Sequence, residues 1–378
     1  MSSLRLNQLS KVLVRNYLAG VNTYVYSKPA VGKTVTVETF AAEMTERMAK
    51  AGQTFSMSLF YAPTMSPMDI VASAPNYETG KLVMYCNQAL PNAYDNPDMK
   101  GCIFIDEMPN ADQATLKLLQ KYVNGEDMSG VLRKPKGVMV IAAGNRLEDK
   151  SGVNQHGRAY LSRFEQHSVF TEANDNIDYA HKQAWHPMVQ TFFKENPALI
   201  DNYDSVFNMA DATDAKDQAV RDKLSEEGKR GIWCNMRAWQ RISDKEFVCD
   251  QMTAAGSNVE LLPSELAGNI GSAAAAQYMT HKRTVNSLAS LADIVKDPAN
   301  VSLPTKMDEQ YILSVLVGMR CEPAQLPQIK TFGERLPLEL QAVILRTISK
   351  RKGFPLASSP VYGQWMLDPK LNAMITGR

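Results

Sequence analysis

The strongest candidate for a ligand-binding segment lies between positions 27 and 34, where the sequence reads SKPAVGKT. A short β-branched and aromatic run, from Thr23 to Tyr26, precedes them and predicts a buried strand. A helix is expected to follow, ending near Met48. A loop that ends in Gly-Lys-Thr between a strand and a helix is typical of a phosphate-binding loop.

The chemistry of such a loop is the capture of a polyphosphate. Backbone N–H groups of the loop and of the first helical turn point at one spot, where the helix dipole adds partial positive charge. Lys33 would reach the β- and γ-phosphates, and the Thr34 hydroxyl would bind Mg²⁺. We therefore expect a nucleotide polyphosphate with Mg²⁺ to contact Ser27, Pro29, Ala30, Val31, Gly32, Lys33, Thr34 and Val35.

One residue departs from the phosphate-loop pattern G-x-x-x-x-G-K-[ST]. Ser27 stands where the first glycine is expected. Serine is small, so the turn can still form, but the departure also favours an alternative in which the loop is purely structural. The position of the loop between a strand and a helix argues for nucleotide binding.

Two adjacent acids supply a second candidate. The segment Gly101 to Glu107 reads GCIFIDE, which predicts a central strand with carboxylates at its carboxyl end. In open α/β sheets this edge is where ligands bind. Asp106 would hold Mg²⁺ through water, and Glu107 would polarise the attacking water. The simpler alternative is a strand followed by an acidic turn.

Further polar residues follow the next predicted strand, GVMVIAAG, which ends at Asn145. The Asn145 amide could orient the water or touch the γ-phosphate, although Gly-Asn is also a common turn. Beyond it, the segment GRAYLSRF carries Arg158 and Arg163, five residues apart. A last short strand is predicted at Val169 and Phe170.

The remaining elements would position these groups. A helix is expected from Leu4 to Ala19, a strand from Gln53 to Tyr61, and a helix from Gln113 to Asn124. The polar segment 62–100 contains six prolines or glycines and is too long for a plain connector, so we expect an insertion there. From residue 174 onward the pattern is helical, and Arg237 falls at the start of one such helix.

Composition limits the broad class of the protein. A length of 378 residues predicts two or three domains, and 44% hydrophobic with 21% charged residues fits a globular protein. The formal net charge of +1 gives no global field to attract DNA or a membrane surface. Five cysteines without C-x-x-C spacing and the lack of a signal-peptide pattern predict reduced thiols in a cytoplasmic protein.

Taken in order, these motifs resemble those of AAA+ ATPases, and within that superfamily the MoxR-like group. The loop resembles Walker A, Asp106 and Glu107 resemble Walker B, and Asn145 matches the polar sensor-1 residue. The segment LSRF is similar to the arginine-finger segment, which makes Arg163 the favoured finger and Arg158 the reserve. NMRAWQRIS resembles the lid motif whose arginine acts as sensor 2, here Arg237, although the family usually has proline at the position of Met236.

The resemblance implies an architecture. An αβα nucleotide-binding core with a parallel sheet is expected over residues 1–172, with the insertion near 62–100. A helical lid that carries sensor 2 would cover 173–255, and a helical extension 256–378. The catalytic residues it implies are Glu107, Asn145, Arg163 and Arg237, and Thr34 and Asp106 are the implied Mg²⁺ ligands.

The resemblance also implies a ring, usually a hexamer, with ATP bound between subunits. Our first hypothesis is a protein-remodelling ATPase of a bacterium or bacteriophage with a protein client, such as a von Willebrand factor A-type protein. The second is a nucleic-acid machine such as a helicase or clamp-loader-like factor, which the neutral charge balance disfavours. The third is an ATP-gated scaffold with slow turnover, which the serine at position 27 keeps open.

Overall fold

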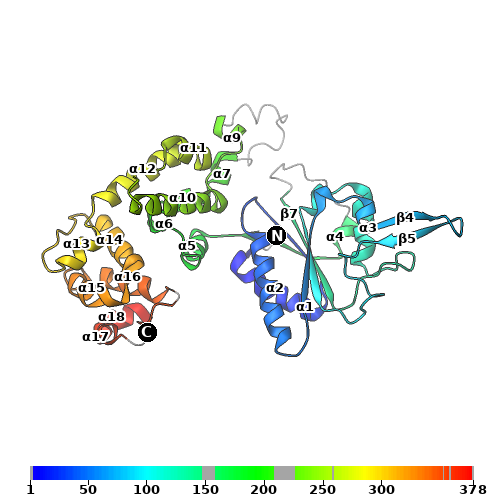
Figure 1. Cartoon of the computed structure of the whole chain (residues 1–378), viewed down its shortest axis with the longest axis horizontal. Coiled ribbons are helices and arrows are strands. Elements are labelled where there is room, and N and C mark those ends of the chain that lie inside the picture. Colours follow the sequence, from blue (N-terminus) through cyan, green and yellow to red (C-terminus); the bar gives the residue numbers. More distant parts are fainter. Residues whose placement is uncertain are drawn as a thin grey trace. The chain divides into compact units, whose positions relative to one another are not determined.

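The structure is a computed structural model that describes residues 3–146, 158–207, 226–257, 259–351, 353–356 and 359–376. The chain divides into two compact units, Met1–Glu172 and Ala173–Arg378 (Figure 1). The first unit combines a sheet with helices, and the described part of the second is helical. The predicted fold class, an α/β core with a parallel sheet followed by a helical region, is confirmed. The further predicted division at residue 255 stays a prediction.

A six-stranded sheet forms the centre of the first unit, and all its pairings are parallel. Its order is β1-β8-β2-β7-β6-β3. The chain therefore passes from β2 to the β3 edge, returns inward through β6 and β7, and crosses β2 to reach β8. The strands are β1 (Ser3–Arg5), β2 (Thr23–Ser27), β3 (Ser56–Tyr61), β6 (Gly101–Asp106), β7 (Val138–Asn145) and β8 (Glu165–Phe170).

The strands alternate their side chains between two apolar layers. On β6, Cys102 and Phe104 join one core, while Ile103 and Ile105 join the other. The first core is covered by α1 (Leu6–Ala19) and α2 (Lys33–Ala49), and the second by α3 (Gln113–Val123) (Figure 1). Because both faces are buried, the central strands read as continuous apolar runs.

The amino-terminal prediction was wrong at its start. Residues 3–5 form strand β1, and helix α1 begins at Leu6 rather than Leu4. Leu4 pairs with Val169 of β8 along the sheet edge. A strand of three residues is too short to show a period of two, so sheet pairing overrode the helical pattern there.

The predicted insertion contains small elements of its own. After two short 3-10 turns, Ala62–Thr64 and Pro67–Asp69, strands β4 (Val71–Asn76) and β5 (Lys81–Cys86) form an antiparallel hairpin. Figure 1 shows the hairpin projecting from the sheet of the first unit. Two large apolar side chains at its end are exposed among polar ones: Tyr77 is 91% and Leu82 72% exposed.

The second unit is built on two apolar cores. One joins α5, α6, α10, α11 and α12, the other joins helices α13 to α18, and α14 contributes to both. In the described ranges, no helix has the length and apolar character needed to cross a membrane. The helices are α5 (Ala173–Lys182), α6 (Pro187–Glu195), α7 (Tyr203–Phe207), α9 (Glu226–Lys229), α10 (Met236–Ala254), α11 (Pro263–Ile270), α12 (Ser272–Ser287), α13 (Leu291–Lys296), α14 (Met307–Arg320), α15 (Leu326–Gly333), α16 (Leu338–Ser349), α17 (Pro360–Trp365) and α18 (Pro369–Thr376).

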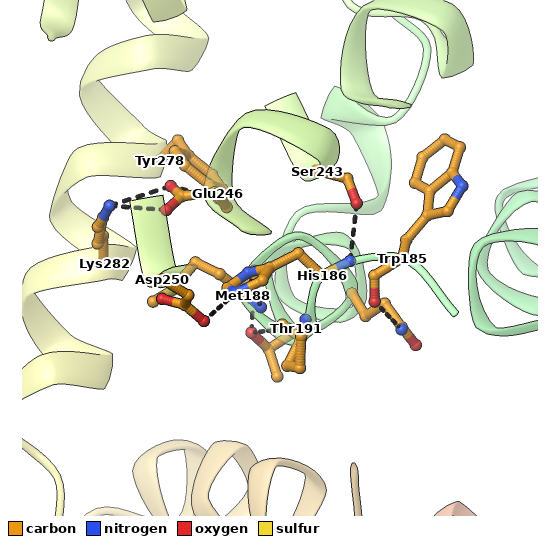
Figure 2. A network of polar contacts seen from close by, with 11 residues as sticks. Trp185, His186, Met188, Thr191, Ser243, Glu246, Asp250, Tyr278 and Lys282 are labelled. Atoms are coloured by element: carbon orange, nitrogen blue, oxygen red, sulfur yellow. Dashed lines mark hydrogen bonds and ion pairs between the residues drawn. The ribbon is translucent and has the colours of Figure 1, made fainter. Parts of the chain in front are cut away.

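A buried ion pair ties α10 to α12 (Figure 2). Lys282 donates to both carboxylate oxygens of Glu246 at 2.8 and 3.1 Å, and the Tyr278 hydroxyl donates to the same carboxylate at 3.1 Å. The side chains of Glu246 and Lys282 are 3% and 10% exposed. Burial raises the pKa of Tyr278, which keeps its hydroxyl a donor.

A histidine extends this network toward α6. The ring of His186 donates from Nε2 to Asp250 at 3.0 Å and accepts at Nδ1 from the backbone N–H of Met188 at 3.2 Å. Burial lowers the pKa of His186, which agrees with a neutral ring that uses one nitrogen as donor and the other as acceptor. A cavity of about 340 Å³ opens beside these contacts, and its wall includes the Glu246–Lys282 ion pair and the hydrogen-bonded His186 and Asp250.

Lys282→Met is expected to lower the free energy of unfolding by about 3–5 kcal/mol, because Glu246 would remain buried without its partner. Lys245→Met is the matched control, since Lys245 pairs with Glu265 between half-exposed side chains, where a loss of at most about 1 kcal/mol is expected. The measurement is the urea midpoint of the transition that reports the second unit. Equal losses in the two variants would contradict a stabilising role for the buried pair.

Candidate functional site

The polar residues predicted from separate segments meet at the carboxyl edge of the sheet. Strand β2 ends at Ser27, its neighbour β7 ends at Asn145, and these two residues are register partners. Strand β6 lies on the other side of β7 and ends at Asp106. The edge lies where the chain order reverses around β2, which is where open α/β sheets bind ligands.

The loop from Ser27 to Gly32 connects β2 to α2 through left-handed backbone. Gly32 caps the helix at φ 102°, a conformation that glycine adopts without strain. Ala30 also has positive φ, at 62°. A left-handed residue other than glycine costs about 1–2 kcal/mol. The sequence analysis did not predict this conformation, because the phosphate-loop pattern allows any residue at position 30.

Lys33, the first residue of α2, reaches back to the sheet edge. Its Nζ donates to the Ser27 hydroxyl at 2.9 Å and to the Asn145 side-chain oxygen at 3.3 Å. The structure therefore joins three predicted site residues through one ammonium group. The sequence analysis placed Ser27 only as a substitute for glycine and missed this contact.

Thr34 and Asp106 form the second link across the site. The Thr34 hydroxyl donates to an Asp106 carboxylate oxygen at 3.0 Å. Mg²⁺ binds oxygen ligands octahedrally at about 2.0–2.1 Å, so adjacent ligands lie about 3 Å apart. The two oxygens therefore have a spacing that fits neighbouring positions around one Mg²⁺ ion.

Glu107 has an unusual backbone and a fixed carboxylate. Its φ is 49°, and its N–H donates to Asp106 at 2.9 Å. One side-chain oxygen accepts from the Tyr61 hydroxyl at 3.0 Å and from the Asn110 amide at 3.2 Å. The bond to Glu107 raises the pKa of Tyr61. Left-handed backbone at a non-glycine residue often accompanies a functional site.

Tyr61 and Asn110 are partners that the sequence analysis missed. Tyr61 is the last residue of β3, and the register pairs it with Asp106 across the sheet. Asn110 ends the 3-10 turn Met108–Asn110 directly after the acidic pair. The sequence holds one indication of the Tyr61 contact: β3, like β6, ends in a polar residue. This indication becomes useful only when the strand order is known, because the order shows that β3 and β6 are neighbours.

Arg163 lies at the opposite edge of the sheet. It comes shortly before β8, whose first residue, Glu165, pairs with Thr23 at the amino end of β2. Its Nε donates to Asn124, at the carboxyl end of α3, at 2.5 Å, and the Gln120 amide oxygen can accept from its terminal nitrogens at 3.0 and 3.2 Å. At about 3.3 Å per residue, the five residues of β2 separate Arg163 from its own phosphate loop by roughly 15 Å.

The other predicted site residues are placed as follows. Val31 is buried, so it can offer a ligand only its backbone, whereas Val35 is 42% exposed. Pro29 lies half-buried in the loop. Arg237 is exposed in the first turn of α10, in the second unit. The side chain of Arg158 lies outside the described residues.

Comparisons with known proteins add the following. No family model matches the chain, and no curated protein matches its sequence. The described fold is similar to a candidate ATPase of Cytophaga hutchinsonii at 16% identity and TM-score 0.33, over 47% of this chain and 50% of that one. It is also similar to the ORC2 protein of Aeropyrum pernix (14% identity, TM-score 0.38, 92% and 95% covered). A third is the RuvB Holliday junction branch migration motor of Thermotoga maritima (13% identity, TM-score 0.34, 77% and 74% covered).

The chain thus spans half the length of the Cytophaga protein and most of the other two. Similarity at this level carries no argument about activity. Any function has to be argued from the residues at the carboxyl edge of the sheet.

Proposed function

We propose that the protein is an ATPase of the AAA+ superfamily, of MoxR-like type. The observation that supports this most is the pair of hydrogen bonds that joins the loop to two separate strands, Thr34 to Asp106 and Lys33 to Asn145. These bonds assemble a hydroxyl, an ammonium, a carboxylate and an amide beside the first N–H groups of helix α2. Together they suit a triphosphate with its metal ion.

In the proposed reaction, Lys33 and the loop N–H groups bind the phosphates. Thr34 and Asp106 would hold Mg²⁺, which neutralises charge on the phosphate oxygens. Glu107 would orient and polarise the attacking water, and Asn145 would contact the γ-phosphate. The bonds from Tyr61 and Asn110 position the Glu107 carboxylate before the nucleotide arrives.

Arg163 and Arg237 would complete the site. Because Arg163 lies at the far edge of its own sheet, it suits the loop of a neighbouring subunit rather than its own. We therefore propose a homo-oligomeric ring, with a hexamer as the expected form. Arg237 is proposed as sensor 2 in a lid at 173–255, whose movement would follow γ-phosphate contacts.

The proposed role is the remodelling of a protein client in the cytoplasm of a bacterial or phage-infected cell. The hairpin β4–β5 supports it, since the exposed Tyr77 and Leu82 at its end suit contact with another protein. A von Willebrand factor A-type client follows from the family resemblance. Hydrolysis stimulated by DNA would instead favour a nucleic-acid machine. Slow turnover in an assembled ring would favour a scaffold, consistent with the serine at position 27 and the left-handed backbone at Ala30.

Lys33→Ala tests the site directly. The variant is expected to lose at least about 100-fold in affinity for ATP with Mg²⁺, because each hydrogen bond to a charged group is worth about 1.5–3 kcal/mol and the lysine makes several. Isothermal titration calorimetry provides the measurement. Lys50→Ala, at the other end of α2, is the control and should bind as the wild type does. Wild-type affinity in Lys33→Ala would rule out the phosphate-loop assignment.

A further inference from the structure

Ser27 is a buried polar residue at a position where the phosphate-loop pattern has no side chain. It is 0% exposed, and its hydroxyl makes two contacts. It donates to the backbone carbonyl of Lys28 at 2.7 Å and accepts from the Lys33 ammonium at 2.9 Å. With its proton committed to the carbonyl, the oxygen presents its lone pairs to Lys33.

The partner of this hydroxyl is the group that the proposed function assigns to the phosphates. Lys33 also donates to Asn145, at the longer distance of 3.3 Å. A phosphate oxygen that approaches the loop therefore meets an ammonium that already has oxygen acceptors within the protein. Glycine at position 27 could not supply the shorter of these two bonds.

We infer that the Ser27 hydroxyl is an internal ligand of Lys33 that competes with the phosphates of the nucleotide. This inference rests on the proposed function and adds a regulator of affinity to the same site. When phosphate binds, Lys33 loses its hydrogen bond to Ser27 and gains one to a phosphate oxygen. The net gain in binding free energy is therefore smaller than the energy of the new bond. The loop consequently binds nucleotides with a β-phosphate more weakly, and releases them faster, than it would without the hydroxyl.

A competing interpretation predicts the opposite change in nucleotide affinity when the Ser27 hydroxyl is removed. If Ser27 positioned Lys33 for the phosphates and kept its bond in the complex, removing the hydroxyl would weaken binding. A merely structural serine would affect AMP and ADP alike, because it would act on the shape of the loop rather than on the lysine. Affinity measured for ligands of different phosphate number therefore separates the three roles.

The test compares Ser27→Ala and Ser27→Gly with the wild type by isothermal titration calorimetry, using ADP and adenylyl imidodiphosphate with Mg²⁺. Both variants are expected to bind these ligands about tenfold more tightly, because Lys33 no longer has to break its hydrogen bond to Ser27. A hydrogen bond to a charged group contributes at least about 1.4 kcal/mol, which corresponds to a tenfold change in affinity. AMP, which lacks the β-phosphate, should bind within twofold of wild type. Ser56→Ala, at the amino end of β3, is the matched control and should change nothing.

Unchanged or weaker binding of ADP in both Ser27 variants would overturn the inference, as would an equal gain for AMP. A second measurement addresses the empty protein without any nucleotide. Acylation of Lys33 by acetic anhydride, followed by peptide mass spectrometry, should be several-fold faster in Ser27→Ala than in the wild type or Ser56→Ala. If no variant binds nucleotide but Lys33 acylation responds as expected, the proposed function fails and the internal contact stands. If acylation does not respond, the internal contact is wrong.

Discussion

Arg163→Ala is expected to lower the ATP turnover of the assembled protein by about 10³- to 10⁵-fold, the range that arginine fingers supply in other phosphoryl-transfer enzymes. The physical reason is the loss of a positive charge beside the γ-phosphate oxygens, where negative charge spreads in the transition state. Binding of ATP to the variant's own loop should persist, since Arg163 lies at the opposite edge of the sheet. Steady-state phosphate release and calorimetric ATP binding measure the two effects.

Mixing two inactive variants tests whether Arg163 acts at the phosphate loop of a neighbouring subunit. Arg163→Ala subunits have an intact loop, and Lys33→Ala subunits have an intact Arg163, so each is inactive alone. A mixture should recover activity where a Lys33→Ala subunit places its arginine against an Arg163→Ala loop. No recovery would contradict a finger that acts between subunits. If Arg158→Ala complements in this way and Arg163→Ala retains turnover, Arg158 is the finger.

A structural role for Arg163 predicts a different result. Its bond to Asn124 ties the segment before β8 to the end of α3. If that bond alone mattered, Asn124→Ala would reduce turnover as strongly as Arg163→Ala. Under the proposed function, Asn124→Ala should retain most of the activity, because the guanidinium remains available to a neighbouring subunit.

Glu107→Gln is expected to bind ATP with wild-type affinity and to lose about 10²- to 10⁴-fold in hydrolysis, the usual contribution of a general base. The amide keeps the size of the side chain and an oxygen that can accept from Tyr61 and Asn110, but it cannot take a proton from water. The loop, Lys33 and Thr34 are unchanged, which preserves binding. Single-turnover phosphate release compared with ATP affinity measures the separation.

The control for this variant is Glu38→Gln, an exposed acid on α2 that should leave turnover unchanged. Normal turnover in Glu107→Gln would refute the water-polarising role. A loss of ATP binding in Glu107→Gln would show that the carboxylate holds the loop together rather than acting on water.

Two features of the loop bear on how fast the proposed ATPase would work. Ala30 stores backbone strain, and Ser27 places a hydroxyl on Lys33. Under the proposed function both residues belong to the phosphate loop, whereas Glu107 and Asn145 are the residue types expected for acting on the attacking water and the γ-phosphate. If the wild-type protein hydrolyses ATP slowly, the loop is therefore the expected cause. Turnover in Ser27→Ala and Ser27→Gly would show whether the serine hydroxyl accounts for the slow rate.

Features that are contiguous along the chain could be predicted from the amino-acid sequence. The strand, loop and helix around Lys33, the acids at the end of β6 and the amide at the end of β7 each lie within one segment, so apolar runs and residue spacing were enough to predict them. The parallel sheet followed from several such runs separated by helical patterns. The prolines and glycines of residues 62–100 located the insertion, but they did not predict that it forms a β-hairpin. Strand β1 has three residues, which is too short for a recognisable alternation of apolar and polar side chains.

Which side chains from different segments contact one another became visible only in the folded chain. The order of the strands places Tyr61 against Glu107, joins Lys33 to both Ser27 and Asn145, and sets Arg163 at the edge away from its own loop. The pairing of Lys282 with Glu246 likewise depends on how α10 packs on α12. Apolar periodicity states which face of an element is buried, but it does not state which element lies against that face, so contacts between distant segments appear only once the chain is folded.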